Sequence, residues 1–323
     1  MKGLPLLLTL GLFAILTLLL ALMVGSVTVA PHQLPSILFG EEEGVAREIV
    51  LQLRLPRALA AFAVGGLLAL AGVQMQVLLG NPLADPYVLG ISGGAAVGAL
   101  LALLAGGAAL AVNGAALGGA LGSMLLVFGL AHGRGPWSPP RLLLTGVVVA
   151  AGWGAVISFL LAVAPQHNLP GMLFWLMGDL SHAAQPLPAL LVLAFGLLLS
   201  LPQGRNLNLL ARGEQQARVL GVSVAPLRLQ LYLLASLLTA AAVTIGGSIG
   251  FVGLVVPHML RLWVGSDHRQ LLPAAVLSGG ILLLLADTLA RAVIAPQQLP
   301  VGVLTALVGV PLFLYLLQRG YRQ

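Results

Sequence analysis

The most constraining feature of this sequence is a series of long apolar runs that follow one another along the chain, separated by short polar connections. Hydrophobic residues make up 59% of the 323 residues and charged residues only 7%, whereas soluble domains carry about 25% charged residues. A helix needs about 20 apolar residues to cross a bilayer core roughly 30 Å thick. The runs are continuous, without the alternating pattern of membrane β-barrel strands. We therefore expect an all-α, polytopic membrane protein in which residues 1–323 form one domain.

About ten of these runs are candidates for transmembrane helices. Most have the length that one span requires. The run 251–264 is short and must be buried among its neighbours or tilt little. The predicted spans are residues 4–24, 56–79, 90–106, 112–132, 142–164, 186–202, 226–247, 251–264, 271–291 and 302–318.

Small residues indicate how so many apolar helices can pack. Helices in lipid gain little from hydrophobicity, so close backbone approach at small residues supplies much of the contact. The chain contains 41 glycines, and some are spaced four apart, which places both on one helix face. The pairs considered as helix contacts are Gly94/Gly98, Gly118/Gly122 and Gly246/Gly250.

The basic residues favour one orientation of these spans. With the N-terminus inside, eleven basic residues fall on the cytoplasmic side and four outside, as the positive-inside rule prefers. This reading explains the net charge of +6 without nucleic-acid binding. It also places the C-terminus in the cytoplasm. The inside set is Lys2, Arg134, Arg141, Arg205, Arg212, Arg218, Arg228, Arg261, Arg269, Arg319 and Arg322; the outside set is Arg47, Arg54, Arg57 and Arg291.

Several kinds of chemistry lack the residues they need. An ATP-binding P-loop requires a lysine, and Lys2 is the only lysine in the chain. There is no cysteine and no close histidine spacing, so we expect no metal site, no cofactor and no catalytic residue. Ion-coupled transporters usually carry ionisable groups at mid-membrane. The carboxylates considered all fall near span ends or in loops, namely Asp85, Asp179, Glu214, Asp267 and Asp287, so energy for uphill transport would enter through another subunit.

Two predicted inner segments depart from plain spans. The longest loop, about 203–225, contains a polar stretch, 214–220, flanked by Gly213 and Gly221. Glycine is favoured at helix ends, and an i,i+4 pair of Glu214 with Arg218 would support a helix. We expect a short cytoplasmic helix there, either lying on the membrane or docking a partner. The other segment, Asn81-Pro82-Leu83-Ala84-Asp85-Pro86, reads as a rigid loop because proline disfavours helix.

Six stretches taken together resemble the permeases of type II ATP-binding-cassette (ABC) importers, the FecCD-like family for iron-siderophores, haem and cobalamin. The resemblance extends from about residue 50 to the C-terminus, with the stretches in the family's order. They are RLPR (54–57), NPLADPYVLGISGGA (81–95), LNLLARGEQQARVLGV (207–222), GSIGFVGLVVPHMLRLWVGSDHRQLLP (247–273), ADTLAR (286–291) and LPVGVLTALVGVPLFLYLL (299–317).

The resemblance implies a ten-helix permease in the bacterial inner membrane that works as a homodimer, with the substrate path along the dimer axis. Two cytoplasmic ATPase subunits would dock beneath it. A soluble binding protein would deliver the metal chelate from outside.

The resemblance also implies roles for three groups of residues. Positions matching the family's ATPase-coupling helices are Gly213, Glu214, Ala217, Arg218, Leu220 and Gly221. Positions matching the face that meets the binding protein are Arg54, Arg57 and Arg291. Positions matching the cytoplasmic gate are Asn81, Pro82, Leu83, Ser138, Pro139 and Pro140, where Pro139-Pro140 departs from the small hydroxyl residues frequent in relatives.

An ion-coupled secondary transporter that works without an ATPase is the alternative. The scarcity of mid-membrane carboxylates and the polar inner segment favour the importer permease. The sequence does not distinguish between a siderophore, haem and cobalamin as the chelate, because specificity in such a system resides mostly in the binding protein.

Overall fold

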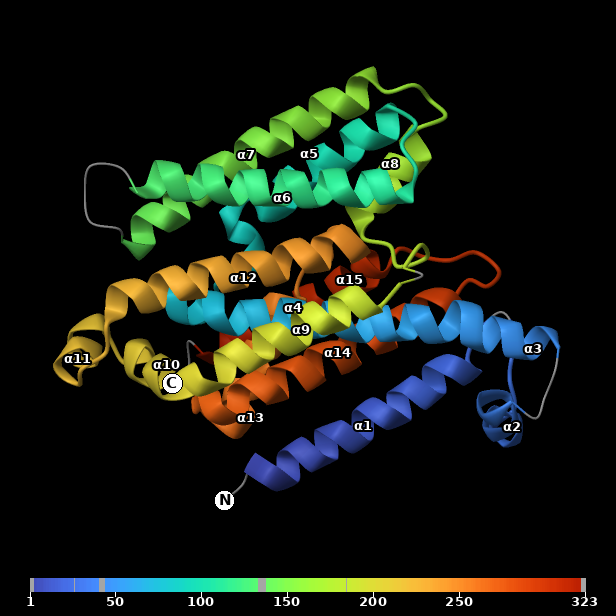
Figure 1. The fold of residues 1–323 in the computed structure, drawn as a ribbon, viewed down its shortest axis with the longest axis horizontal. Helices are drawn as coiled ribbons and strands as arrows, with labels where there is room; N and C mark the ends of the chain where they lie inside the picture. Colours follow the sequence, from blue (N-terminus) through green and yellow to red (C-terminus); the bar gives the residue numbers. More distant parts are fainter. Residues whose placement is uncertain (1–2, 26, 41–43, 133–137, 184, 321–323) are drawn as a thin grey trace.

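A computed structural model describes residues 3–25, 27–40, 44–132, 138–183 and 185–320, except for the side chains at 316, 317, 319 and 320. The described residues form a bundle of helices (Figure 1). Seven helical segments are long and apolar enough to span a membrane, and three shorter apolar helices bring the number to ten in this part of the chain, which confirms the all-α, ten-span prediction. The ten segments are α1 (Gly3–Met23), α3 to α4 (Val45–Leu79), α5 (Ile91–Leu104), α6 (Ala109–His132), α7 (Pro139–Val163), α9 to α10 (Leu187–Ala211), α12 (Val224–Gly246), α13 (Val252–Val264), α14 (His268–Ala292) and α15 (Val301–Gly320).

Short helices cap the two ends of the bundle (Figure 1). One end, called the α11 end here, carries α10 (Gly204–Ala211) and α11 (Glu214–Val219). The start of α1 is at this end too, because Gly3 lies against the side chain of Gln270 near the start of α14. The opposite end, called the α2 end, carries α2 (Leu34–Phe39), α3 (Val45–Glu48) and α8 (Leu169–Met177).

The second span begins earlier than the sequence predicts. Its helix is continuous from Val45, through a π-helical segment η2 (Ile49–Arg54), into α4 (Leu55–Leu79). The predicted span began at residue 56, and Pro56 lacks an amide donor. The wider turns of η2 precede Pro56, so the missing hydrogen bond falls where the helical pattern already changes.

Two inner segments are more helical than predicted. Within 203–225, α10 precedes the expected short helix and carries Leu207 and Leu210, both buried, on one face. The i,i+3 spacing of these two leucines was the available signal. Pro139 and Pro140, which precede the predicted span 142–164, occupy the first two positions of α7, where a helix tolerates proline because its first amides have no intrahelical acceptor.

Helix α4 is the centre of the bundle. It packs against α14, α12, α13 and α9, and 89% of its most apolar window is buried. By contrast, only 11% of the corresponding window of α7 and 17% of that of α1 is buried. A helix apolar on all sides can be buried this way without an amphipathic stripe, so α4 serves as the common packing partner of its neighbours.

Backbone-to-backbone contact holds α4 against two neighbours. A Cβ atom on Gly65 would overlap the carbonyl oxygen of Gly279 on α14. One on Gly72 would overlap the carbonyl oxygen of Gly253 on α13. These contacts need glycine on α4, because a side chain there would overlap the neighbouring backbone. Close approach of two backbones is what stabilises helix pairs in lipid.

The predicted glycine pairs differ in outcome. Gly94 and Gly98 on α5 do lie against α6, at Gly119 and Ala115 respectively, so this pair is confirmed. A Cβ atom added to Gly118 or Gly122 would meet nothing within 4 Å, so within the described chain these two glycines form no such contact. Of the third pair, Gly246 packs against Ile249, Leu180 and Val64, and Gly250 faces open space.

Adding one methyl group at Gly72 tests the central packing. We expect Gly72→Ala to lower the free energy of unfolding by about 1–3 kcal/mol, the usual cost of overpacking, because the backbone of Gly253 cannot move aside. The measurement is thermal unfolding in detergent followed by the fluorescence of the four tryptophans. Gly11→Ala on α1, where no atom lies within 4 Å, is the matched control. Equal melting temperatures for the two variants would contradict the packing argument.

Candidate functional site

The short helix predicted at 214–220 is present as α11, at the tip of the α11 end. Gly213 precedes it at φ +128° and Gly221 follows it at φ +84°, both in the left-handed region that favours glycine. Glu214 pairs with Arg218, as predicted. It also pairs at 2.9 Å with Arg228 of α12, a partner that the i,i+4 pattern did not reveal. The pair with Arg228 attaches α11 to the start of α12.

The outer face of α11 is unusually apolar for a helix outside the spans. Val219 is 86% exposed and Leu220 is 60% exposed, whereas the methyl group of Ala217 is buried against the bundle. Arg218 lies next to these residues with 67% of its side chain accessible. An exposed apolar patch bordered by charged residues is typical of a protein interaction surface.

The residues assigned to the gate lie in two segments toward the same end. Asn81, Pro82 and Leu83 follow α4 in a turn, where the Asn81 side chain accepts a hydrogen bond from the Leu83 amide at 2.9 Å. Ser138 and Pro139 are half-buried and Pro140 is exposed at the start of α7. Among the described residues no hydrogen bond joins the two segments.

A cavity of about 630 Å³ opens beside these elements. Its lining includes the end of α4, Pro82 of the proposed gate segment, α10, and the turn between α13 and α14. The polar lining residues include Asn208, Arg261 and Asp267. Hydrogen bonds from the Asn208 side chain and the Arg269 amide hold the pKa of the Asp267 carboxyl below its usual value, so this group is ionised at neutral pH.

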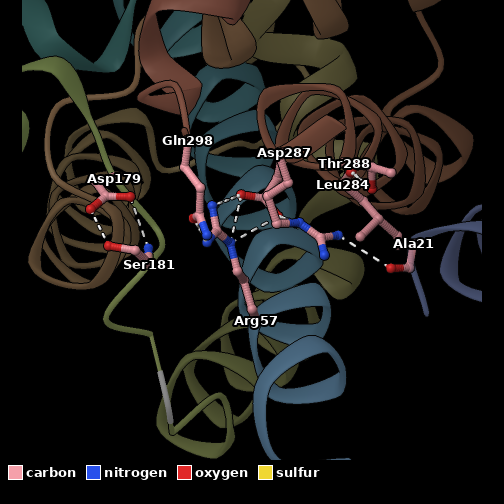
Figure 2. Close-up of polar contacts among 9 residues, drawn as sticks. Ala21, Arg57, Asp179, Ser181, Leu284, Asp287, Thr288 and Gln298 are labelled. Atoms are coloured by element: carbon pink, nitrogen blue, oxygen red, sulfur yellow. Dashed lines mark hydrogen bonds and ion pairs between the residues drawn. The ribbon is translucent and has the colours of Figure 1, made fainter. Parts of the chain in front are cut away.

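The three arginines assigned to binding-protein docking are at the α2 end, and all three are buried in the chain. Arg57 donates to both carboxylate oxygens of Asp287 at 2.8–3.1 Å and to the Gln298 side chain at 2.5 Å (Figure 2). Arg291 pairs with the same carboxylate at 3.2 Å and donates to the carbonyl of Ala21. Asp287 and Arg291 are four residues apart on α14, so this is also a local i,i+4 ion pair.

Arg54 is held differently from the other two. Only 4% of this residue is exposed, and its guanidinium donates to the backbone carbonyls of Leu22, at 2.8 Å, Met23 and Val27. These bonds attach the start of α4 to the end of α1. The sequence predicted an arginine at this helix end but not that it would bind backbone carbonyls.

Asp287 lies five residues before the end of α14, so the expectation that the carboxylates fall near span ends or in loops holds for it. The sequence did not indicate that this side chain would be buried, yet Asp287 is 0% exposed. The segment after Ala292 folds back, and Gln298 bonds to Arg57 beside it. Two arginines compensate the carboxylate, so it serves as the shared anion of an ion cluster formed by Arg57, Asp287 and Arg291.

Removing the shared anion should destabilise the protein more than removing one cation. Asp287→Asn leaves two buried arginines without a counterion, which costs about 3–5 kcal/mol in comparable buried pairs. Arg57→Gln leaves Asp287 paired with Arg291 and should cost less. We expect Arg57→Gln/Asp287→Asn to recover part of the loss of Asp287→Asn, measured by thermal unfolding in detergent. A double variant less stable than Asp287→Asn would contradict this account of the cluster.

A second cavity, of about 820 Å³, lies near this ion cluster. It is bounded by α8 and by the segment after α14, and its lining includes Trp175, Asp179 and Gln298. Asp179 accepts a hydrogen bond from the Ser181 amide at 2.9 Å (Figure 2). Gln298 therefore contacts both the cavity and Arg57.

Comparison with known proteins assigns this architecture to a family. The model of the FecCD transport family matches residues 12–319. The cobalamin import system permease protein BtuC of Halobacterium salinarum is 44% identical over 283 residues, covering 87% of this chain and 76% of that protein. The hemin transport system permease protein HmuU of Yersinia pestis is 44% identical over 283 residues, covering 85% and 84%.

A solved structure supports the same assignment. It is an ABC transporter of the metal-chelate type in an inward-facing conformation, with a TM-score of 0.87, 33% identity, and coverage of 97% of this chain and 98% of that one. The fold is thus that of a type II ABC importer permease, as predicted. The ten spans and the match to the family model both extend over nearly the whole chain. This chain belongs to the FecCD transport family of membrane-spanning permeases.

Proposed function

We propose that this chain is the permease subunit of an ATP-driven importer and forms the path for a metal chelate across the bacterial inner membrane. Family membership over residues 12–319 is the observation that carries the proposal. The relatives described above are named for cobalamin and hemin, and the structural neighbour for metal chelates. An iron-siderophore, haem or cobalamin is therefore the proposed class of cargo.

ATP hydrolysis belongs to a separate pair of cytoplasmic ATPase subunits in this proposal. They would dock on α11, through Gly213, Glu214, Ala217, Arg218, Leu220 and Gly221. The exposed apolar side chains of Val219 and Leu220 support this surface, because apolar groups outside the spans would be covered by a partner. Movement of α11 would reach α12 through Glu214, which pairs with Arg218 in α11 and with Arg228 in α12.

The proposed orientation places the α11 end in the cytoplasm. Seven described arginines lie at this end and four at the α2 end, as the positive-inside rule favours. Lys2, Arg134 and Arg322, and the side chain of Arg319, lie outside the described residues. The seven are Arg141, Arg205, Arg212, Arg218, Arg228, Arg261 and Arg269; the four are Arg47, Arg54, Arg57 and Arg291. The N-terminus is then cytoplasmic with the start of α1, and the C-terminus is proposed to be so.

A homodimer would complete the path. Helix α7 is the least buried of the seven long apolar segments, as expected of a helix that packs on a second copy along the dimer axis. The gate segments Asn81–Leu83 and Ser138–Pro140 would then meet their symmetry mates at the cytoplasmic end.

A soluble binding protein would deliver the chelate at the α2 end. Docking through Arg54, Arg57 and Arg291 stays a prediction, and it requires these buried side chains to exchange part of their present hydrogen bonds. Their charge supports it: Arg57 and Arg291 share one carboxylate, and Arg54 donates to backbone carbonyls. The excess positive charge would attract acidic groups on a partner and speed association.

An ion-coupled secondary transporter is the alternative. Asp287 is the buried carboxylate that such a mechanism would need. Its two arginine partners argue against a role as a proton relay, because protonating it would leave both cations uncompensated. We therefore favour the importer.

The test is uptake into proteoliposomes that contain the permease and the ATPase encoded beside it, with the neighbouring binding protein added. Hemin, cyanocobalamin and a ferric hydroxamate siderophore are the cargoes to compare. We expect ATP-dependent uptake of one of them by the wild type. Ala217→Pro should abolish substrate-stimulated ATP hydrolysis, because it removes the amide that bonds to Gly213 and costs about 3 kcal/mol locally.

Two controls separate coupling from folding. Ala217→Pro should still insert into the membrane with the wild-type melting temperature of the bundle, since α11 lies outside the spans. Gln215→Ala changes the same helix without breaking its backbone bonds. Cargo uptake that needs an ion gradient and no ATPase would overturn the proposal in favour of the alternative.

A further inference from the structure

An asparagine in the coupling segment is bonded to a distant turn of the chain. Asn208, on α10, donates from Nδ2 to Asp267 Oδ1 at 2.8 Å. Its Oδ1 accepts from the His268 amide at 2.8 Å and lies 2.7 Å from His268 Nδ1. Because Nδ2 meets a carboxylate, which only accepts, the orientation of the amide is fixed. One side chain therefore joins α10 to the turn between α13 and α14.

Local structure alone does not require this junction. Asp267 caps the start of α14 through the Arg269 amide at 3.1 Å, an ordinary N-cap that Asn208 does not need to support. His268 is 1% exposed, and its Nε2 is buried without a hydrogen-bond partner among the described residues. The ring is thus held by the Asn208 side of the imidazole, which makes Asn208 the link between the two segments.

A second set of hydrogen bonds begins on α13, just before this turn, and leads toward the gate. Arg261, near the end of α13, donates to the Oε1 atom of Gln76 on α4. The Nε2 atom of Gln76 donates to the carbonyl of Leu254 at 3.3 Å and to that of Ala84 at 3.4 Å. Ala84 directly follows the proposed gate residues Asn81–Leu83. Gln76, Asn208, Arg261, Asp267 and His268 all line the cavity of about 630 Å³.

We propose that Asn208 is a positioning residue that transmits the movement of the coupling segment, through the α13–α14 turn and Gln76, to the α4–α5 loop that carries the gate. The inference rests on the proposed function. Along the chain, α10 is continuous only with α9 and, through α11, with α12. The Asn208 junction adds a direct route to α13 and α14, the helices that contact α4 through glycine backbone.

A double-variant cycle across the junction gives a sharp test. Asn208→Ala removes every bond of the junction, and Asn208→Asp places a second carboxylate against Asp267, so that like charges repel. Asp267→Ser removes the carboxylate that Asn208 binds and keeps a side-chain oxygen at the N-cap of α14. If Asn208 acts through Asp267, Asn208→Ala/Asp267→Ser should lower the ratio of cargo imported to ATP hydrolysed no further than Asn208→Ala alone.

The readout is the amount of cargo imported per ATP hydrolysed in proteoliposomes, for whichever of hemin, cyanocobalamin or the ferric hydroxamate the wild type imports. We expect Asn208→Ala and Asn208→Asp to lower this ratio about tenfold, the size of a strong coupling between contacting residues, with basal ATP hydrolysis retained. Asn208→Ala/Asp267→Ser should give the same ratio as Asn208→Ala, because both changes break the same junction. Gln270→Ala is the matched control, because its side chain lies on the same helical turn but contacts Gly3.

The outcomes separate transmission from folding. A purely structural role would lower the melting temperature and reduce uptake and ATP hydrolysis together, without changing their ratio. That result, or a wild-type ratio in both Asn208 variants, would overturn the inference. If Asn208→Asp fails to insert, Asn208→Ala and the double variant still decide, since a ratio in the double variant well below that of Asn208→Ala refutes transmission through Asp267. A wild type that imports none of the three cargoes with ATP would contradict the proposed function itself.

Discussion

Direct contact between glycine backbones around α4 is the constraint on which the rest of the structure depends. In lipid, burial of apolar surface does not drive helices together, so packing must come from close approach and from hydrogen bonds. Gly65 and Gly72 let α4 touch α14 and α13 without intervening side chains. A contact between two backbones cannot be adjusted by rotamer changes, so α4, α13 and α14 form one rigid block, called the α4 block here.

Polar groups stabilise the α4 block at both ends, in different ways. At the α2 end, Asp287 binds Arg57 and Arg291 from two helices of the block. At the α11 end, Gln76 and Arg261 join α4 to α13, and Asn208 adds the coupling segment. Inside a membrane such groups are tolerated when they are paired. The block can therefore act as a lever whose α11 end is attached to the segments that would meet the ATPase.

Much of this fold could be predicted from apolar run length alone, because span length and helical hydrogen bonding leave few alternatives in a bilayer. The helix α11 followed from Gly213, Gly221 and one charge pair. The contacts of Asn208 and the burial of Asp287 could not be predicted, since each depends on partners 59 and 230 residues away in sequence. Likewise, glycine spacing identified a helix face at Gly94 and Gly98 but could not say which faces find a partner.

The central claim is that the α4 block stays rigid while the gate loop moves. Spin labels at Leu262→Cys on α13 and Leu289→Cys on α14, both exposed positions, report a distance inside the block of one copy. A single label at Leu83→Cys reports the distance between the two copies of the proposed dimer at the gate, and the wild type has no cysteine to interfere. Pulsed electron spin resonance of the reconstituted complex, with and without ATP, measures both distances. The account predicts that the Leu83 distance changes with nucleotide and the distance inside the block does not. A change inside the block as large as that at Leu83, or no change at Leu83, would contradict it.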